Sequence, residues 1–246
     1  MRYNYRMTTN DSTILYIDCE TDDSGNLEIK EFDLTRLEHP THKRPLRLGA
    51  VKFRTTSIGC DVTTIKEAVI GAIESMKYDV IVAPEYTFFP FLGPMDEERR
   101  DKYVEDLKTA TVGRDILVAP GSFIWQKDGE MYNSAYVFNN GKVLYDYRKS
   151  NNGGDEDIAK RFSLEMKFGE SPNSFLWDNL NIGVEICADR GRLYRDRGIT
   201  ELDLMLLLSC GIDTPDTNAI RPGGYAVVCD GSDRCYQAVQ HKIEYS

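Results

Sequence analysis

Three side chains with complementary chemistry follow three apolar segments of the sequence. Glu85 comes directly after DVIVAP, Lys149 after VLYDYR, and Cys187 after NIGVEI. A cysteine becomes a nucleophile when a base takes its proton, and a carboxylate in a dry pocket can be that base. A nearby ammonium lowers the pKa of a thiol and can stabilise an oxyanion. Together the three groups would support attack on a carbonyl or nitrile carbon.

Each of the three residues also has an ordinary structural explanation. A free cysteine often behaves as a small buried hydrophobe, and charged residues are mostly exposed. Cys187 nevertheless stands where the alternating apolar run NIGVEI gives way to the polar sequence ADRG, a pattern typical of a strand end. Layered α/β domains usually build their sites at strand ends. The combination of the three residues, rather than any one of them, predicts a catalytic site.

The segments around these residues predict a layered α/β domain with a mixed β-sheet. Strands are predicted at residues 46–53, 79–83, 115–125, 131–138, 142–147, 181–186 and 202–208, and helices at residues 60–76 and 96–110. The sequence Asn-Asn-Gly at residues 139–141 predicts a hairpin between the strands that flank it.

Residues 1–45 are predicted to be an N-terminal extension, and residues 46–246 the catalytic domain. Within the extension, residues 13–19 and 27–32 predict two strands of a β-hairpin around a turn at residues 22–26. His39 and His42 could suggest a metal pair. Pro40 and Pro45 beside them, and the lack of a third ligand nearby in the sequence, favour a linker instead.

Composition limits the classes of function. The chain of 246 residues is 41% hydrophobic, which is enough for a sizeable core, and its formal net charge of −10 argues against binding to nucleic acid or to an anionic membrane. The six cysteines form no CxxC pair. The start of the sequence lacks the apolar core of a signal peptide, and no apolar run approaches the roughly 20 residues of a membrane span. We therefore expect a reduced, cytoplasmic protein.

The motifs resemble those of the nitrilase superfamily, the carbon–nitrogen hydrolases, which use a Glu-Lys-Cys triad on an αββα sandwich. The matching segments are DVIVAPEYTFFP, YNSAYVFNNGKVLYDYRKS and NIGVEICADRG, and the strands LRLGAVKF and LDLMLLLS also fit in order. The resemblance runs from about residue 46 to residue 209. It implies one half of a four-layer αββα arrangement, with helices on the outer face of a mixed sheet.

The resemblance also implies a role for each matching residue. Glu85 would be the general base, Lys149 the cation that stabilises the oxyanion, and Cys187 the nucleophile that forms a thioester. The backbone N–H of Ala188 would be a second oxyanion donor. Tyr86, next to the base, is a candidate for contact with the substrate. No metal or organic cofactor is implied.

The family places a second glutamate before the cysteine, where it orients the lysine and the base. Glu165 is the first choice, because the sequence EMKFG that it opens resembles the family's glutamate-to-glycine stretch. Glu156 and Glu170 are alternatives. Glu165 could equally be an outward-facing loop residue, since charged side chains mostly stay exposed.

The substrate is expected to be a small amide, a ureido compound or a nitrile. The Cys-x-Asp form at residues 187–189 resembles the amidase and carbamoylase branches. Arg190 matches a position where some carbamoylases hold a substrate carboxylate, a task that suits bidentate arginine. In that role, Arg190→Ala raises KM for a carboxylated substrate. The alternative is an arginine paired with Asp189 or another acid.

Two departures from the family pattern bear on the site. The run SNNGG follows the lysine, where the family usually has His-Leu, and we expect it to be flexible and to border the pocket. Only residues 211–222 separate Cys210 from the next strand, and the family's usual closing strands do not follow. Those parts commonly form the subunit contact, so a homodimer is a candidate assembly whose geometry stays open.

Two other functions remain as alternatives. The chain could be a degenerate family member that binds a small molecule or a protein partner without turnover, which the shortened C-terminal region favours and the intact triad opposes. A papain-like thiol hydrolase would need a histidine partner for the cysteine. None of the three histidines lies in a motif that resembles that family's.

Overall fold

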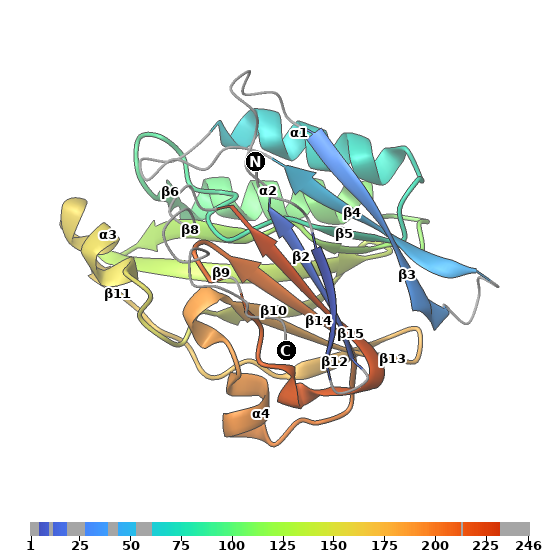
Figure 1. The fold of residues 1–246 in the computed structure, drawn as a ribbon. Coiled ribbons are helices and arrows are strands. Elements are labelled where there is room, and N and C mark those ends of the chain that lie inside the picture. The colour runs from blue at the N-terminus through green and yellow to red at the C-terminus, as the bar shows by residue number, and fades with distance from the viewer. Residues whose placement is uncertain are drawn as a thin grey trace.

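Two β-sheets pack face to face, with helices on their outer faces (Figure 1). The structure is a computed structural model that describes residues 5–9, 12–18, 28–38, 44–52, 61–212 and 214–231. Within these ranges the six-stranded sheet has the order β1-β2-β15-β14-β13-β12. The nine-stranded sheet has the order β3-β4-β5-β7-β9-β8-β6, with β10 and β11 also paired to β9. This arrangement confirms the predicted αββα fold class.

The strands of the six-stranded sheet are β1 (Tyr5–Thr9), β2 (Ser12–Asp18), β12 (Ser174–Trp177), β13 (Leu180–Ile186), β14 (Leu202–Ser209) and β15 (Ile220–Asp230). Those of the nine-stranded sheet are β3 (Glu28–Glu38), β4 (Pro45–Lys52), β5 (Val80–Val82), β6 (Met95–Asp96), β7 (Leu117–Ala119), β8 (Ser122–Lys127), β9 (Glu130–Asn139), β10 (Lys142–Arg148) and β11 (Glu165–Met166). The helices are α1 (Val62–Glu74), α2 (Glu97–Ala110), α3 (Asp155–Arg161) and α4 (Arg192–Arg197), with short 3-10 turns η1 (Cys187–Asp189) and η2 (Thr217–Ala219).

β14 shows why the middle of the six-stranded sheet is so apolar. Every residue of this strand is buried, and it lies parallel to β13 on one side and to β15 on the other. Leu204 and Leu206 face the core between the sheets, whereas Met205 faces outward and shares a cluster with Leu193 of α4. A strand covered on both faces needs a continuous apolar run rather than an alternating one.

The two long helices form where the sequence predicts them. α1 starts after Asp61, whose side chain accepts hydrogen bonds from the N–H groups of Thr63 and Thr64 and so caps the helix. α2 buries Tyr103 and Leu107. Both helices lie on the outer face of the nine-stranded sheet (Figure 1). In the described ranges, no helix is long and apolar enough to cross a membrane.

The predicted hairpin between β9 and β10 is confirmed. The strands pair antiparallel, and Asn140 and Gly141 in the turn have φ angles of 45° and 73°. Two consecutive positive φ angles are the requirement of the tight turn that Asn-Gly favours. The hairpin brings the residue after β10, Lys149, alongside Asn133 of β9, whose carbonyl oxygen accepts the Lys149 N–H at 2.8 Å.

The two N-terminal strands form, but the predicted pairing between them is wrong. β2 pairs with β1 and β15 in the six-stranded sheet, whereas β3 pairs with β4 in the nine-stranded sheet. Ile17 of β2 and Leu34 of β3 both belong to the core between the sheets. The local pattern predicts a strand, but its partner depends on which distant sheet edge is open to it. His39 and His42 lie outside the described residues, so the linker remains a prediction.

Candidate active site

Glu85 lies in a tight turn just beyond β5. Its backbone N–H donates to the carbonyl oxygen of Ser209 at the end of β14, at 3.3 Å, which ties the turn to the opposite sheet. Tyr86 has a φ of 61°, and its N–H donates to Ser122 Oγ at 3.0 Å. This left-handed backbone is unfavourable for a bulky residue and is held by these bonds. The turn leaves Glu85 only 1% exposed.

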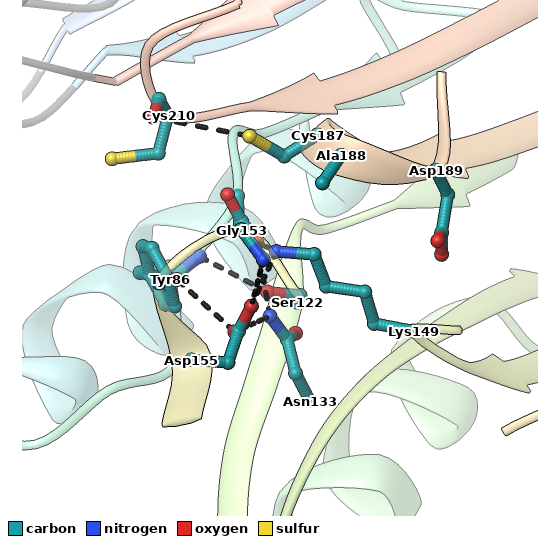
Figure 2. A network of polar contacts seen from close by, with 12 residues as sticks. Tyr86, Ser122, Asn133, Lys149, Gly153, Asp155, Cys187, Ala188, Asp189 and Cys210 are labelled. Carbon is teal, nitrogen blue, oxygen red and sulfur yellow. Dashed lines mark hydrogen bonds and ion pairs between the residues drawn. The ribbon is translucent and has the colours of Figure 1, made fainter. Parts of the chain in front are cut away.

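Lys149 is completely buried and binds two carboxylates, of which Figure 2 labels Asp155. Its Nζ donates to Glu85 Oε1 and to Asp155 Oδ2, each at 2.7 Å. Its backbone carbonyl accepts the N–H of Gly169 at 3.0 Å, so the main chain is fixed as well. Buried charges are tolerated when they are paired and hydrogen-bonded in this way.

Two further side chains bind the same carboxylates. Asn133 Nδ2 donates to Glu85 Oε1 at 3.0 Å and to Asp155 Oδ1 at 2.9 Å. The Tyr86 hydroxyl donates to Asp155 Oδ1 at 3.1 Å. Asp155 also accepts the N–H of Gly153 at 3.2 Å. Asp155 is therefore saturated with donors, whereas Glu85 Oε2 is buried and accepts a hydrogen bond from none of these groups.

Cys187 is the first residue of the turn that leaves β13. It has a φ of 44°, a strained conformation for a residue other than glycine, and it is 6% exposed. Its Sγ lies 3.9 Å from the carbonyl oxygen of Cys210, just past the neighbouring strand β14. In Figure 2 the Cys187 thiol lies on one side of Gly153, and the Lys149–Asp155 pair lies on the other.

Gly153 keeps the space between these groups open. A Cβ atom at this position would lie 2.9 Å from Lys149 Nζ and 3.0 Å from the Cβ of Ala188. Both distances are tighter than ordinary van der Waals contacts of a carbon atom. A side chain here would press on the Lys149 ammonium and on Ala188, the residue after Cys187.

A buried carboxylate holds the backbone beyond Cys187. Glu185, two residues before Cys187 on β13, is fully buried. Its side chain accepts the N–H of Gly191 at 2.8 Å and the N–H of Leu193 at 2.9 Å. These bonds fix the start of α4 relative to the end of β13 and so define the path of the turn.

The run at residues 150–154, expected to be flexible, is bound to the turn at Cys187–Asp189. Ser150 donates to the buried Asp189 twice, from its N–H at 2.9 Å and from its hydroxyl at 2.8 Å. Asn151 Nδ2 donates to the carbonyl oxygen of Ala188 at 3.0 Å. The segment after the lysine therefore connects the two sides of the site.

Burial changes the proton affinities of Glu85 and Cys187. It raises the pKa of Glu85 to about 7, an effect that the positive charge of Lys149 partly offsets. Burial also raises the pKa of the Cys187 thiol well above its usual value, and the nearby Glu85 charge adds to this shift. The thiol is therefore protonated at neutral pH. A carboxylate with a pKa near 7 can both accept a proton and return it at that pH.

The cation and the second carboxylate stay ionised. Burial alone would lower the pKa of Lys149, but the negative charges of Glu85 and Asp155 outweigh it and raise that pKa. Burial would likewise raise the pKa of Asp155, but the charge of Lys149 and the hydrogen bonds to it lower that pKa. The site thus holds a fixed ion pair beside a carboxylate that titrates.

The structure brings Glu85, Lys149 and Cys187 together, with Ala188 and Tyr86 beside them, but other candidate residues lie elsewhere. Glu165 is exposed on β11, where its backbone pairs with Glu130 of β9. The carboxylate that binds Lys149 Nζ is Asp155.

Arg190 is exposed and faces a loop rather than an acid. Its Nη1 donates to the carbonyl oxygen and the hydroxyl of Thr214, at 3.0 and 2.9 Å. Asp189, the acid next to it in the sequence, binds Ser150 instead. The structure thus pairs this arginine with Thr214, and its role in binding a substrate carboxylate remains a prediction.

Two site residues were missed by reasoning from the sequence. Asp155 opens α3, directly after Gly154, and only its neighbour Glu156 was considered. Asn133 is a polar residue at an inward position of β9, in line with the buried Met131 and Ala135. A polar residue on the buried face of a strand is an unusual choice that needs partners, and this is the signal that could have found it.

A comparison with protein families matches residues 53–192, more than half of the chain, to the carbon–nitrogen hydrolases. The chain belongs to the carbon–nitrogen hydrolase family. The matched segment includes the turn with Glu85, the end of β10 with Lys149, and Cys187. A comparison with curated proteins finds no match.

Solved structures of other proteins share the fold of this carbon–nitrogen hydrolase. An amidase from Nesterenkonia sp. has a TM-score of 0.53 and 19% identity, over 76% of this chain and 78% of that chain. A double mutant of the Nesterenkonia sp. AN1 amidase, in complex with acrylamide, has a TM-score of 0.54 and 19% identity, with the same coverage. Glutamine-dependent NAD+ synthetase from Acinetobacter baumannii has a TM-score of 0.50 and 22% identity over 64% of this chain, which spans only 31% of the synthetase. At these identities the similarity concerns the fold.

Proposed function

We propose that this carbon–nitrogen hydrolase cleaves the non-peptide carbon–nitrogen bond of a small amide through a thioester on Cys187. The observation that supports this proposal most is the buried ammonium of Lys149, held at 2.7 Å from Glu85 in a site shared with the Cys187 thiol. A base, a cation and a nucleophile in one dry site are the groups that acyl transfer to sulfur requires.

The reaction begins with proton transfer to Glu85. Because the resting thiol is protonated, Glu85 takes its proton as the sulfur attacks the substrate carbon. The oxyanion that forms lies between the Lys149 ammonium and the backbone N–H of Ala188. Glu85 then returns its proton to the leaving amine, and a thioester remains on Cys187. Water, deprotonated by Glu85, hydrolyses the thioester to a carboxylic acid and restores the thiol.

Asp155 takes the supporting role that the sequence assigned to Glu165. It binds the Lys149 ammonium together with Glu85, and it is itself fixed by Tyr86 and Asn133. A positioned ammonium needs no rearrangement when negative charge develops, which is the source of electrostatic catalysis.

An amide is the substrate class that we favour over a carboxylated N-carbamoyl compound. Arg190, the candidate for binding a substrate carboxylate, instead binds Thr214. The structurally similar amidase from Nesterenkonia sp. AN1 has been captured with acrylamide and with an acetamide group on its active-site cysteine. A site of similar fold can therefore take small uncharged amides.

Ammonia release from a panel of small amides, ureido acids and nitriles tests the proposal. We expect wild type to release ammonia from at least one amide, and Cys187→Ala to release none. Cys210→Ala is the matched control, because Cys210 lies beside the site but has no assigned chemical role. Release that survives in Cys187→Ala would contradict the thioester mechanism.

A binding protein without turnover is the second candidate. The near-complete burial of Cys187 and Lys149, which are 6% and 0% exposed, favours it because a substrate must reach the thiol. Alkylation by iodoacetamide separates the two functions. Rapid modification of Cys187 that Glu85→Gln slows would indicate an activated nucleophile, whereas slow modification that Glu85→Gln leaves unchanged would favour a binding protein.

A further inference from the structure

Asn133 contacts the residues of the candidate site but has no role in the reaction proposed above. It lies in β9, is fully buried, and points its side chain to the same face as Ala135 and Val137, toward the space between the sheets. Its backbone carbonyl accepts the Lys149 N–H at 2.8 Å. Main chain and side chain of this one residue therefore contact both the lysine and its two carboxylate partners.

The amide of Asn133 can face the carboxylates in only one orientation. Its nitrogen donates to Glu85 Oε1 and to Asp155 Oδ1, at 3.0 and 2.9 Å. Ionised carboxylates only accept hydrogen bonds, so an amide oxygen in this place would face two acceptors. Both hydrogens of the amide nitrogen are thus committed, one to each acid.

The two oxygens of Glu85 differ because of this contact. Oε1 receives both Lys149 Nζ and Asn133 Nδ2, whereas Oε2 is buried and accepts a hydrogen bond from neither. We propose that Asn133 is a positioning residue that fixes the Glu85 carboxylate so that Oε2 remains for the proton of Cys187. This inference rests on the proposed function, in which Glu85 is the base.

The Asn133 amide also influences the pKa of Glu85, because of the charges around that carboxylate. One ammonium faces two carboxylates, and the Asp155 charge raises the pKa of Glu85. A neutral donor shared by both acids stabilises their ionised forms without adding a charge. The ionisable groups around Glu85 are Lys149 at the end of β10, Asp155 of α3, Cys187 after β13, and the hydroxyls of Tyr86 and Tyr147.

Loss of the amide should therefore shift the titration of the base upward. In Asn133→Ala, Glu85 loses one donor, and we expect its pKa to rise by about one unit. Asn133→Asp has nearly the same size as wild type but replaces the donor by a third acid, so a larger upward shift is expected. Because aspartate has nearly the same size as asparagine, Asn133→Asp can still be measured if Asn133→Ala does not fold.

The experiment measures the rate of iodoacetamide alkylation at the Cys187 peptide from about pH 5 to about pH 9, with mass spectrometry as the readout. It needs no substrate. Wild type should show a rise in rate through the pKa of Glu85, and the rise should move to higher pH in Asn133→Ala and Asn133→Asp. Asn139→Asp is the matched control, since Asn139 lies on the same strand and its side chain binds the carbonyl oxygen of Ile116 at 3.0 Å.

The outcomes distinguish the two proposals. A wild-type rise that Glu85→Gln abolishes but that both Asn133 variants leave in place would overturn the role of Asn133 while the proposed function stands. A shift of equal size in Asn139→Asp would also overturn it, because the effect would then be a general one on the strand. If the alkylation rate of wild type shows no rise with pH that depends on Glu85, Glu85 is not the base. The proposed function would then be wrong as well.

Discussion

The two sheets contribute to the candidate site in different ways. The nine-stranded sheet and the helix after it supply an acid–base half, Glu85, Lys149, Asp155 and Asn133, in which every member is bound to another at 3.0 Å or less. The six-stranded sheet leads into Cys187, whose sulfur lies 3.9 Å from the carbonyl oxygen of Cys210 and next to the Glu85 carboxylate. The first half is fixed through its side chains and the second through its backbone.

This difference shows how the fold can place a thiol beside a fixed acid–base pair. A carboxylate and an ammonium must be fixed in advance to stabilise developing charge, whereas a thiol needs only a base within hydrogen-bond reach. The two halves are therefore aligned by the contacts between them. They include the Ser150–Asp189 and Asn151–Ala188 hydrogen bonds and the bond from the Glu85 N–H to the Ser209 carbonyl oxygen.

Lys149→Met breaks the acid–base half and should have the largest effect. Two buried carboxylates would face each other without a cation, which typically costs about 3–5 kcal/mol of stability, and kcat should fall roughly 100- to 1000-fold. Urea unfolding and amide hydrolysis measure the two effects. Lys127→Met is the control, because Lys127 forms an exposed ion pair with Glu97. An equal loss in both variants would contradict the account.

The pH profile of kcat/KM sharpens the role of the base. Glu85 must be ionised to take the thiol proton, and burial raises its pKa to about 7. Activity should therefore fall about tenfold for each pH unit below that value, since only the ionised fraction reacts. Steady-state rates on a small amide at a series of pH values measure this acidic fall in kcat/KM. A profile that stays flat down to about pH 5, near the ordinary pKa of glutamate, would exclude Glu85 as the base.

Gly153→Ala tests the space between the halves. The added Cβ would lie 2.9 Å from Lys149 Nζ and 3.0 Å from the Cβ of Ala188, so the ammonium or the turn must shift. A shift of this kind should lower kcat by roughly tenfold, since small misplacements of reacting groups are costly. Gly71→Ala on α1 is the control, because its Cβ would meet no atom within 4 Å. Unchanged kinetics in Gly153→Ala would show that the segment moves freely.

Glu185 tests the half that holds Cys187 through its stability rather than through a rate. Burial raises its pKa from 4.5 to about 7, so the folded state binds its proton more tightly than the unfolded chain. Its stabilising effect is thus complete below about pH 4.5 and is lost as pH rises through about 7. The stability difference between wild type and Glu185→Gln should shrink by on the order of 3 kcal/mol across this window. Urea unfolding at several pH values measures it, and a constant difference would refute it.

Much of the fold followed from periodicity in the sequence. Apolar runs located β5, β13 and β14, the helical stripe and Asp61 located α1, and Asn140-Gly141 located a hairpin, because each signal is local. The pairing of β2 and β3 could not be predicted in the same way. Their partners, β15 and β4, are set by the assembly of two sheets rather than by the intervening turn.

In the candidate site, too, some residues could be predicted from local sequence, whereas others depend on distant contacts. Glu85, Lys149 and Cys187 could be selected because strand ends and complementary chemistry are visible in sequence. Asp155 could not be separated from Glu156 and Glu165, since which of several acids turns inward depends on the path of the chain after Lys149. That path is set by contacts across the site, beginning with the bonds between Ser150 and a residue on the opposite sheet.

The most direct test of a site shared by both sheets is the mass of the enzyme trapped during turnover. Wild type mixed with a small amide and quenched in acid should carry one acyl group, and peptide mapping should place it on the peptide that contains Cys187. Glu85→Gln should accumulate much less of it, because the base from the opposite sheet is lost. An acyl group on Cys210 instead, or no acyl group while the amide is consumed, would contradict the account.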